Sequence, residues 1–165
     1  LRTDTHWTPY GARVAAEAAA QVANGLLEQA RSPRVAFSAA YGEVTEHYGD
    51  LVNFIRLGAW LERVGPAPDA VRPFTAVQPG STDLGLFDDV TIPVVLVGTS
   101  YSAGSLWSFD SALKVSLQAD VLNVAEEGRG PFEPMNELLG SGVLEDVQAD
   151  VVIWEIPERY FRSPR

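Results

Sequence analysis

One short stretch constrains the fold of this chain more than any other. Residues 92–102 read IPVVLVGTSYS, in which an unbroken apolar run, Val94–Val97, leads directly into Gly98, Thr99 and Ser100. A run without polar alternation is typical of a strand that is buried on both faces of a parallel sheet. Gly98 allows the backbone to turn sharply, and a helical pattern begins soon afterwards. The stretch therefore predicts a hydroxyl at the carboxyl end of a central strand, where open α/β sheets bind their ligands.

Two interpretations of Ser100 are open at this point. In the first, Ser100 is a nucleophile whose partners are Asp4 and His6, which lie at the other end of the chain. Serine needs an adjacent base, histidine titrates near neutral pH, and an acid behind the histidine fixes its tautomer. In the second, the serine merely caps a helix after an ordinary strand and turn, and Asp4 and His6 only precede another helix.

Composition excludes several classes of function. The formal net charge is −10, from 22 acids and 12 bases, which argues against a nucleic-acid binder because such proteins need a basic face. A polyanionic substrate would need a local basic patch against this overall field. Since the chain has no Cys, disulfides, zinc–thiolate sites and thiol catalysis are excluded.

The length of 165 residues allows one domain with a proper core, and we treat residues 1–165 as that domain. No uninterrupted apolar segment is long enough to cross a membrane. The chain begins Leu1-Arg2-Thr3 without Met, and an Asp of a catalytic set so close to a true terminus would lie on a fraying end. We therefore expect that the domain lacks its N-terminal part here.

The chain in order predicts alternating helices and strands. Thr8 and Pro9 are typical of an N-cap and a first helical residue, and the Ala-rich helix that follows is expected to end or kink at Asn24-Gly25. His47, without a carboxylate at triad-like spacing, is expected at the surface. The other expected elements are an edge strand at 35–39, a helix at 50–61, a Pro-rich surface excursion at 64–89 with a strand at 74–77, a helix at 106–117, a strand at 120–125, a helix at 132–139 that stops at Gly140, and a strand at 150–156.

From Pro93 onward this order is β-α-β-α-β, which predicts a parallel, right-handed, layered α/β sheet. Because the carboxyl ends of parallel strands share one edge, Ser100, Gly128 and residues 155–160 are expected at the same edge. Asp4 and His6 reach that edge if the first helix packs on the sheet. Backbone N–H groups at Ser100 and at the Gly-rich turn would there be available to hold an oxyanion.

Four motifs together point to a known family. They are DTHWTP at 4–9, GTSYS at 98–102, NVAEEGRGP at 123–131 and WEIPERYF at 154–161. With them the chain resembles, over nearly its whole length, the SGNH-hydrolase-like domain of the alginate O-acetyltransferases of the AlgJ/AlgX type. The resemblance implies a three-layer α/β/α fold with a mainly parallel sheet. It also implies a permuted motif order, in which the D-x-H motif precedes the serine.

The resemblance also implies roles for individual residues. Ser100 would be the nucleophile, His6 the base and Asp4 its orienting acid, with the N–H groups of Ser100 and Gly128 as the oxyanion hole. The third motif block of the family normally supplies an Asn, but residues 155–158 read EIPE, which leaves a third oxyanion donor unassigned. No metal or cofactor is implied. Residues expected to bind substrate are Tyr101, Arg129, Arg159 and Tyr160, although a surface Arg and a packed Tyr would equally explain the last two.

The function implied is transfer of an acetyl group, through an acetyl-serine, onto hydroxyls of a polyuronate exopolysaccharide such as alginate. The setting implied is the bacterial periplasm, in a membrane-associated biosynthetic complex where a membrane acyltransferase partner delivers the acetyl donor. Upstream sequence would anchor the domain to the inner membrane. Two alternatives stay open: a carbohydrate acetylesterase with the same site, and an inactive polysaccharide-binding module. The local cations for a polyuronate would be Arg2, Arg129, Arg159 and Arg162.

Overall fold

A small parallel sheet forms the centre of the computed structural model, which describes residues 1–79 and 91–162. Its strand order is β6-β5-β7, with β5 (Val94–Val97) between β6 (Val121–Asn123) and β7 (Val151–Trp154). The prediction of a buried central strand is confirmed, with the same bounds as the apolar run. All four residues of β5 are buried, and burial of each such side chain contributes about 1.5–3 kcal/mol.

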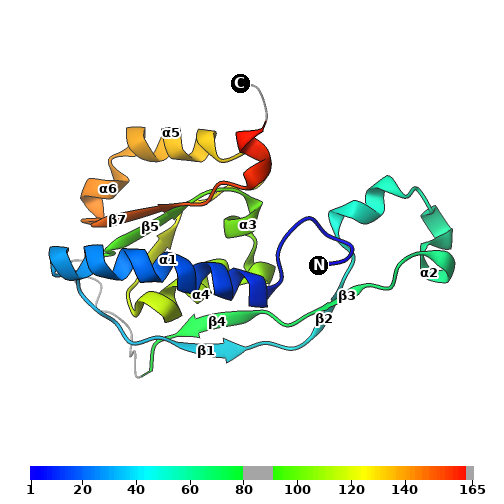
Figure 1. The fold of residues 1–165 in the computed structure, drawn as a ribbon, viewed down its shortest axis with the longest axis horizontal. Coiled ribbons are helices and arrows are strands. Elements are labelled where there is room, and N and C mark those ends of the chain that lie inside the picture. Colours follow the sequence, from blue (N-terminus) through cyan, green and yellow to red (C-terminus); the bar gives the residue numbers. More distant parts are fainter. Residues whose placement is uncertain (80–90, 163–165) are drawn as a thin grey trace.

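Helices cover both faces of this sheet, so the molecule has an α/β/α centre (Figure 1). Alternate side chains of β5 point to opposite faces, as strand geometry requires. Val94 and Leu96 pack into one core cluster with α1 and α4, whereas Val95 and Val97 pack into a second cluster with residues of α5 and α6. The four helices are α1 (Pro9–Ala30), α4 (Phe109–Leu117), α5 (Phe132–Ser141) and α6 (Val143–Asp146).

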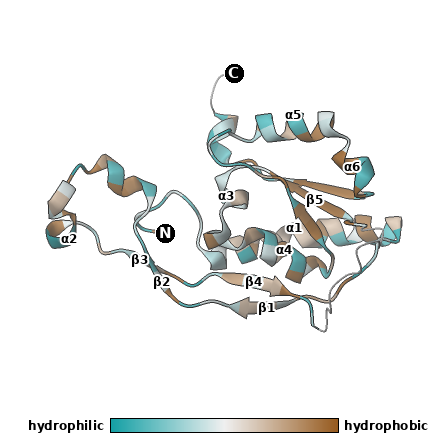
Figure 2. Ribbon diagram, turned by 180° about the vertical axis from the view of Figure 1, so that it is seen from behind, coloured by the Kyte–Doolittle hydropathy of each residue, from teal (hydrophilic) through white to brown (hydrophobic). Residues whose placement is uncertain are grey.

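Apolar residues concentrate in this centre. The strands of the sheet are among the most hydrophobic parts of the ribbon, whereas the helices carry a mixture of hydrophilic and hydrophobic residues (Figure 2). The β-α-β-α-β order expected from Pro93 onward is confirmed by the succession β5, α4, β6, α5 and β7, whose strands are all parallel. The expectation of one mainly parallel sheet is only partly right, because the other described strands form two separate antiparallel pairs.

The first helix, α1, begins where the sequence predicts. The Thr8 side chain accepts a hydrogen bond of 3.0 Å from the backbone N–H of Gly11, and Pro9 is the first helical residue. The expected break at Asn24-Gly25 is wrong, since the helix continues to Ala30. Tertiary packing explains this difference, because Ala23 and Leu27 on either side of the glycine are buried against the core.

The two antiparallel pairs lie outside the parallel sheet (Figure 1). In the first, β1 (Ser38–Tyr41) pairs with β4 (Phe74–Val77). The strand predicted at 74–77 is confirmed, whereas the edge strand predicted at 35–39 begins three residues later. In the second, β2 (Thr45–His47) pairs with β3 (Asp69–Val71), and His47 lies opposite Asp69. We call this pair the β2–β3 hairpin, although residues 48–68 separate its two strands. It holds the N-terminal segment of the chain, as described below.

The prediction of a helix over residues 50–61 is wrong. Short turns occupy this stretch: η1 (Asp50–Phe54), η2 (Gly58–Trp60) and the start of α2 (Leu61–Val64). Arg56 and Gly58 adopt positive φ angles, 51° and 50°, which interrupt any helix. The apolar side chains therefore do not share a buried face, and Phe54 and Trp60 are 81% and 59% exposed.

The remaining differences concern helix ends. The helix expected at 106–117 is divided at Ser108, whose φ of 58° separates η3 (Ser105–Trp107) from α4. The helix expected to stop at Gly140 continues through Gly140 to Ser141, and its C-cap is Gly142, where φ is 79°. Two short helices complete the chain, α3 (Ser100–Ala103) and η4 (Glu158–Phe161). Residues 80–90, part of the excursion expected at 64–89, lie outside the described residues.

We expect two glycine substitutions to have opposite effects on stability. A Cβ at Gly25 would meet no atom within 4 Å, so Gly25→Ala should raise the free energy of unfolding by about 0.5–1 kcal/mol through helix propensity. A Cβ at Gly49 would lie 2.2 Å from the Cβ of Asp4, so Gly49→Ala should lower it. Urea denaturation of both variants measures the two changes. A stabilising Gly49→Ala would contradict the close packing of this segment.

Candidate active site

The N-terminal segment is bound to the β2–β3 hairpin by one buried carboxylate. Asp69 accepts hydrogen bonds from the backbone N–H groups of Arg2 and Thr3 and, at 2.6 Å, from the Thr3 hydroxyl. A second carboxylate, that of Asp50, accepts from the backbone N–H and the hydroxyl of Thr5. These contacts join residues far apart in sequence. They hold the segment that carries Asp4 and His6 in one place.

The structure brings Asp4, His6 and Ser100 together. Nδ1 of His6 lies 2.5 Å from Oδ1 of Asp4, and Nε2 of His6 lies 2.8 Å from Oγ of Ser100. Because a carboxylate only accepts hydrogen bonds, the Nδ1 proton points to Asp4, and Nε2 is left to accept from the serine hydroxyl. Asp4 is buried, His6 is 16% exposed in its side chain, and Ser100 is partly accessible. The alcohol is therefore paired with a base in a residue that is only partly buried.

Aromatic rings fix the imidazole of His6 on two sides. The indole of Trp107 stacks on it, with ring centroids 4.7 Å apart and an interplanar angle of 12°, and the ring of Tyr101 lies 4.6 Å away on a tilt. The Trp7 indole N–H donates to the backbone carbonyl of Tyr101 at 3.1 Å. Since His6 and Trp7 are neighbours, this bond ties their segment to the helix that begins at Ser100.

The turn that carries Ser100 is held by Glu155, the first residue after β7. Its Oε2 accepts from the backbone N–H and the hydroxyl of Thr99, each at 2.8 Å, and from the Ser102 hydroxyl at 3.2 Å. Thr99, not Ser100, is the N-cap of α3, so the interpretation of Ser100 as a capping residue is wrong. Gly98 is needed for space, because a Cβ there would lie 2.7 Å from Oε2 of Glu155.

The environment of Asp4 keeps it ionised. Burial raises the pKa of this carboxyl, but hydrogen bonds from the His47 side chain and from the backbone and side chain of His6 lower it to about 2. Asp4 is therefore a carboxylate at any pH where His6 can act as a base. A carboxylate in that state can orient a neighbouring imidazole and can stabilise an imidazolium ion.

The expectation that His47 lies at the surface is wrong, because its side chain is partly buried and contacts Asp4. Its Nε2 lies 2.7 Å from Oδ2 of Asp4, the carboxylate oxygen that does not face His6. Its side chain is only 25% exposed, and its ring lies edge-on to the Trp107 indole, with ring centroids 5.4 Å apart. The carboxylate lies 43 positions away in sequence, which explains why local spacing did not reveal it.

The Gly-rich turn after β6 carries two residues with predicted roles, Gly128 and Arg129. Gly128 is exposed and has a φ of 77°, a conformation that favours glycine. Its role as an oxyanion donor stays a prediction. Arg129, expected to bind substrate, lies among the carboxylates of three residues, which raise the pKa of its guanidinium. They are Glu137, Glu133 and Glu126. Its charge is thus already balanced within the protein.

Arg159 and two tyrosines form a cluster next to Ser100. The Arg159 guanidinium lies 5.4 Å from the ring centroid of Tyr101 and 5.2 Å from that of Tyr160. It also donates to the Tyr101 hydroxyl at 3.4 Å, and that hydroxyl donates to the backbone carbonyl of Thr5. Tyr101 follows Ser100 directly and its ring contacts that of His6, so this cluster is connected to the candidate site through Tyr101.

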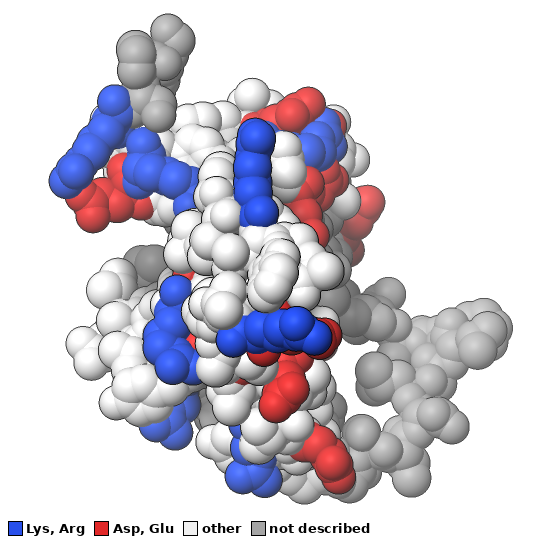
Figure 3. Space-filling view, turned by 90° about the vertical axis from the view of Figure 1, so that its right-hand side faces the viewer, with Lys and Arg blue, Asp and Glu red and all other residues white. Residues whose placement is uncertain are grey.

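Two further cations expected near the site are also paired. Arg2 lies 3.3 Å from Asp69, and Arg162 lies 2.5 Å from Glu158. On the face shown in Figure 3, Lys and Arg are scattered, several of them beside an acidic side chain. Among the described residues, no helix combines the length and the apolar character that spanning a bilayer requires.

Ligand atoms of Asp4, His6 and Asp50 lie within 4.8 Å of one another. Each of these side chains already has hydrogen-bond partners: Asp4 and His6 bind each other, and Asp50 binds Thr5. Internal hydrogen bonding thus accounts for this cluster.

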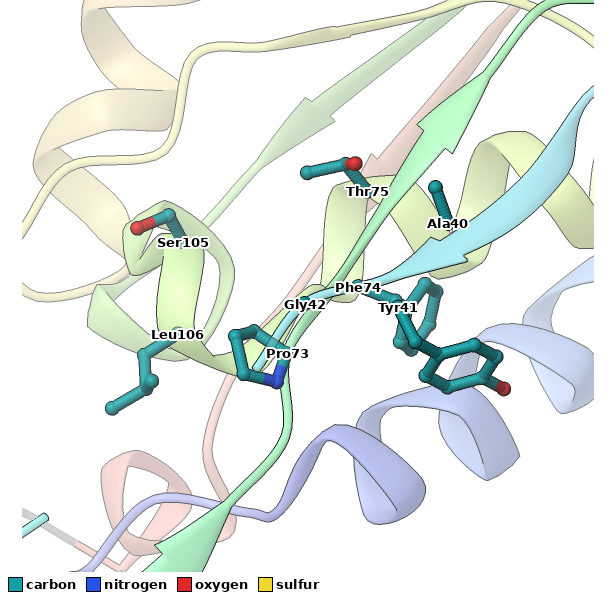
Figure 4. Close-up of a pocket in the computed structure, with 8 residues that line it drawn as sticks. All are labelled: Ala40, Tyr41, Gly42, Pro73, Phe74, Thr75, Ser105 and Leu106. Carbon is teal, nitrogen blue, oxygen red and sulfur yellow. The ribbon is translucent and has the colours of Figure 1, made fainter. Parts of the chain in front are cut away.

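An apolar pocket of about 420 Å³ lies between the β1–β4 pair and η3 (Figure 4). Pro73 and Phe74 line one wall, whereas Ser105 and Leu106 of η3 line the other. The same short helix carries Trp107, the residue that stacks on His6. Asp4, His6 and Ser100 are not among the lining residues. The pocket therefore contacts the short helix that carries Trp107 rather than the serine itself.

Comparison with known proteins gives consistent matches. Residues 1–158 match the family model described as "SGNH hydrolase-like domain, acetyltransferase AlgX". The protein named "Probable alginate O-acetylase AlgJ" from Pseudomonas putida is 44% identical over 165 residues, which cover 97% of this chain and 42% of that protein. The protein named "Alginate biosynthesis protein AlgX" from Pseudomonas fluorescens is 33% identical, covering 97% of this chain and 33% of that protein.

Two solved structures share the fold. The O-acetyltransferase domain of Pseudomonas putida AlgJ superposes with a TM-score of 0.82 at 39% identity, covering 100% of this chain and 55% of that one. Pseudomonas aeruginosa AlgX superposes with a TM-score of 0.71 at 25% identity, covering 94% of this chain and 35% of that one. The chain spans less than half the length of the curated relatives described above.

The site's attachment to the hairpin predicts a dependence of stability on pH. Hydrogen bonds from Thr3 and Arg2 lower the pKa of Asp69, whereas burial raises it. The hydrogen bonds outweigh burial and hold this pKa far below its usual 3.8. A carboxyl with a depressed pKa stabilises the fold above its unfolded-state pKa, and this contribution is lost as the pH falls. The difference in free energy of unfolding between the unsubstituted protein and Asp69→Asn should therefore shrink below about pH 4. Urea denaturation at several pH values measures it, and a constant difference would contradict the assignment.

Proposed function

Because this chain belongs to the SGNH hydrolase-like acetyltransferase family of AlgX and AlgJ, we propose that it moves an acetyl group onto hydroxyls of alginate through an acetyl-serine. In this proposal Ser100 is the nucleophile, His6 the general base and Asp4 the acid that orients it. The observation that carries the proposal is the 2.8 Å contact between His6 Nε2 and Ser100 Oγ, two atoms from residues 94 positions apart. The order of the motifs, with D-x-H before the serine, is part of the proposal.

The first half-reaction acylates the serine. His6 Nε2 takes the Ser100 hydroxyl proton while Oγ forms a bond to the carbonyl carbon of an acetyl ester or thioester donor. The resulting oxyanion is held by the N–H groups of Ser100 and Gly128, and each such donor lowers the barrier by about 3 kcal/mol. When the tetrahedral intermediate collapses, the donor's leaving group departs with the proton from His6. The product is acetyl-Ser100 with neutral His6.

The second half-reaction moves the acetyl group to the acceptor. A sugar hydroxyl gives its proton to His6 Nε2 and attacks the acetyl carbonyl, and Ser100 leaves as the alcohol with that proton. Atoms and charge balance over the two steps, and nothing is oxidised or reduced. If water attacks instead, the same site is a carbohydrate acetylesterase. A site that never acylates would leave the third alternative, a polysaccharide-binding module.

Alginate as acceptor is supported by the names of the relatives. A polyuronate carries carboxylates, whereas this chain has a net charge of −10, so a local cation is required. We propose Arg159 for this role, with Tyr101 and Tyr160, because its guanidinium lies against the ring of Tyr101, the residue that follows Ser100. Arg129 is left out, since three glutamates surround its charge. Periplasmic location and delivery of the donor by a membrane partner remain part of the proposal.

Removing the nucleophile tests the chemistry. Incubation with 4-nitrophenyl acetate should add one acetyl group to Ser100, detected by mass spectrometry of the intact protein and its peptides. Ser100→Ala should abolish the adduct, and His6→Gln should slow its formation about 10³-fold or more, because the serine then lacks its base. An alginate oligosaccharide should accept the acetyl group, whereas release of acetate alone would identify an esterase. Equal acylation of the Ser100→Ala variant would contradict the assignment.

Neutralising Arg159 tests the acceptor site separately. Arg159→Gln should raise KM for an alginate oligosaccharide about tenfold, since a charge-assisted contact is lost, and should leave acylation by 4-nitrophenyl acetate unchanged. The effect should diminish with added salt. Arg13→Gln, which removes an exposed cation paired with Glu17 on α1, is the matched control. If both variants give the same KM, Arg159 does not bind the acceptor.

A further inference from the structure

We propose that His47 is a positioning residue of this site, which holds the Asp4 carboxylate in the orientation that His6 needs. The inference rests on the proposed function and extends it to a residue outside the four motifs. His47 Nε2 lies 2.7 Å from Oδ2 of Asp4, and His6 Nδ1 lies 2.5 Å from Oδ1 of the same group. One carboxylate thus joins two imidazoles.

The chemistry of a buried carboxylate explains why a second donor matters. Asp4 is 6% exposed, and an ionised carboxyl in such a place is costly unless its oxygens receive hydrogen bonds. Oδ1 receives two, from the backbone N–H and from Nδ1 of His6. The hydrogen bond that the structure gives to Oδ2 comes from His47. Without it, the carboxyl would gain by taking up a proton or by turning toward water, and either change weakens its bond to His6.

The hairpin fixes His47 independently of Asp4. His47 pairs with Asp69 in the β2–β3 register, and its ring lies edge-on to the Trp107 indole at an interplanar angle of 78°. The same indole stacks on His6 at 12°. One aromatic ring therefore sets the positions of both imidazoles, and the carboxylate lies between their nitrogen atoms.

The N-terminal segment has other attachments, so His47 is not needed merely to hold it. Asp69 binds Arg2 and Thr3, and Asp50 binds Thr5, on either side of Asp4. Substitution of His47 should therefore disturb the carboxylate without releasing the segment. This separation makes a positioning role distinguishable from a structural one.

The test compares two amides at position 47. The side-chain amide nitrogen of Gln matches the place of Nε2 in His, whereas that of Asn is one bond shorter and falls short of Oδ2. His47→Asn should lower the rate of Ser100 acylation by 4-nitrophenyl acetate about 10- to 100-fold, the range for a hydrogen bond to a charged group, with KM changed less than about twofold. His47→Gln should restore most of that rate. Glu46→Gln, an exposed neighbour on β2, should behave as the unsubstituted protein.

A second readout does not depend on turnover. The proton of His6 Nδ1, held by Asp4, should give a far-downfield ¹H NMR signal in the unsubstituted protein and in His47→Gln, and this signal should be lost or shifted upfield in His47→Asn. An unchanged signal and rate in His47→Asn would overturn the positioning role. If the Asn variant does not fold, loss of the signal in a folded Gln variant overturns it. Absent acylation with a signal that still depends on His47 would refute the proposed chemistry but support the positioning role.

Discussion

The site depends on the attachment of an N-terminal segment through two carboxylates, the buried Asp69 of the β2–β3 hairpin and the partly buried Asp50 of η1. Asp69 accepts hydrogen bonds from the backbone N–H groups and the side chains of Arg2 and Thr3, and Asp50 accepts two from Thr5. An extended segment of this kind has no regular structure of its own to fix it, so these bonds offset the entropy of ordering it. Because they do so, Asp4 and His6 meet a serine that lies at the far side of the sequence. The parallel sheet presents the serine, and the hairpin presents its partners.

The second half of the site is fixed by a carboxylate as well. Glu155, which follows β7, accepts hydrogen bonds from the backbone N–H and the hydroxyl of Thr99 and from the hydroxyl of Ser102. These bonds hold the turn that carries Ser100. Glu155 begins the stretch where the family motif would supply an oxyanion donor, yet a carboxylate cannot donate when ionised. Its contacts support the backbone of the turn instead. The lack of an Asn there thus coincides with a different function for this position.

The sequence predicted well whatever depends on local pattern. The bounds of β5, the Thr8 cap and the alternation of strands and helices after Pro93 all follow from apolar runs and capping chemistry. The meeting of the D-x-H and serine motifs was inferred from the shared edge of parallel strands and from the family resemblance. Neither source of inference depends on contacts that only the folded hairpin creates.

The wrong predictions concern features that short-range sequence patterns do not reveal, namely the partner of His47 and the backbone conformation of residues 50–61. His47 was expected at the surface because its carboxylate partner lies 43 positions away, beyond any helical or strand period. Residues 50–61 had a helical apolar pattern, but positive φ at Arg56 and Gly58 breaks it into turns. Arg129, expected to bind substrate, forms ion pairs with Glu126, Glu133 and Glu137, three to eight positions away, and a role toward substrate stays a prediction. The signal that could have drawn attention to His47 was that the chain has only two histidines, His6 and His47.

A crystal structure of the protein after reaction with a serine-directed alkyl phosphonate would test the central claim most directly. The account predicts a phosphonyl group on Ser100, with His6 Nε2 within hydrogen-bond distance of a phosphonyl oxygen and residues 2–7 bound to the β2–β3 hairpin. An unmodified Ser100, or a modified one with His6 in a different part of the molecule, would contradict it.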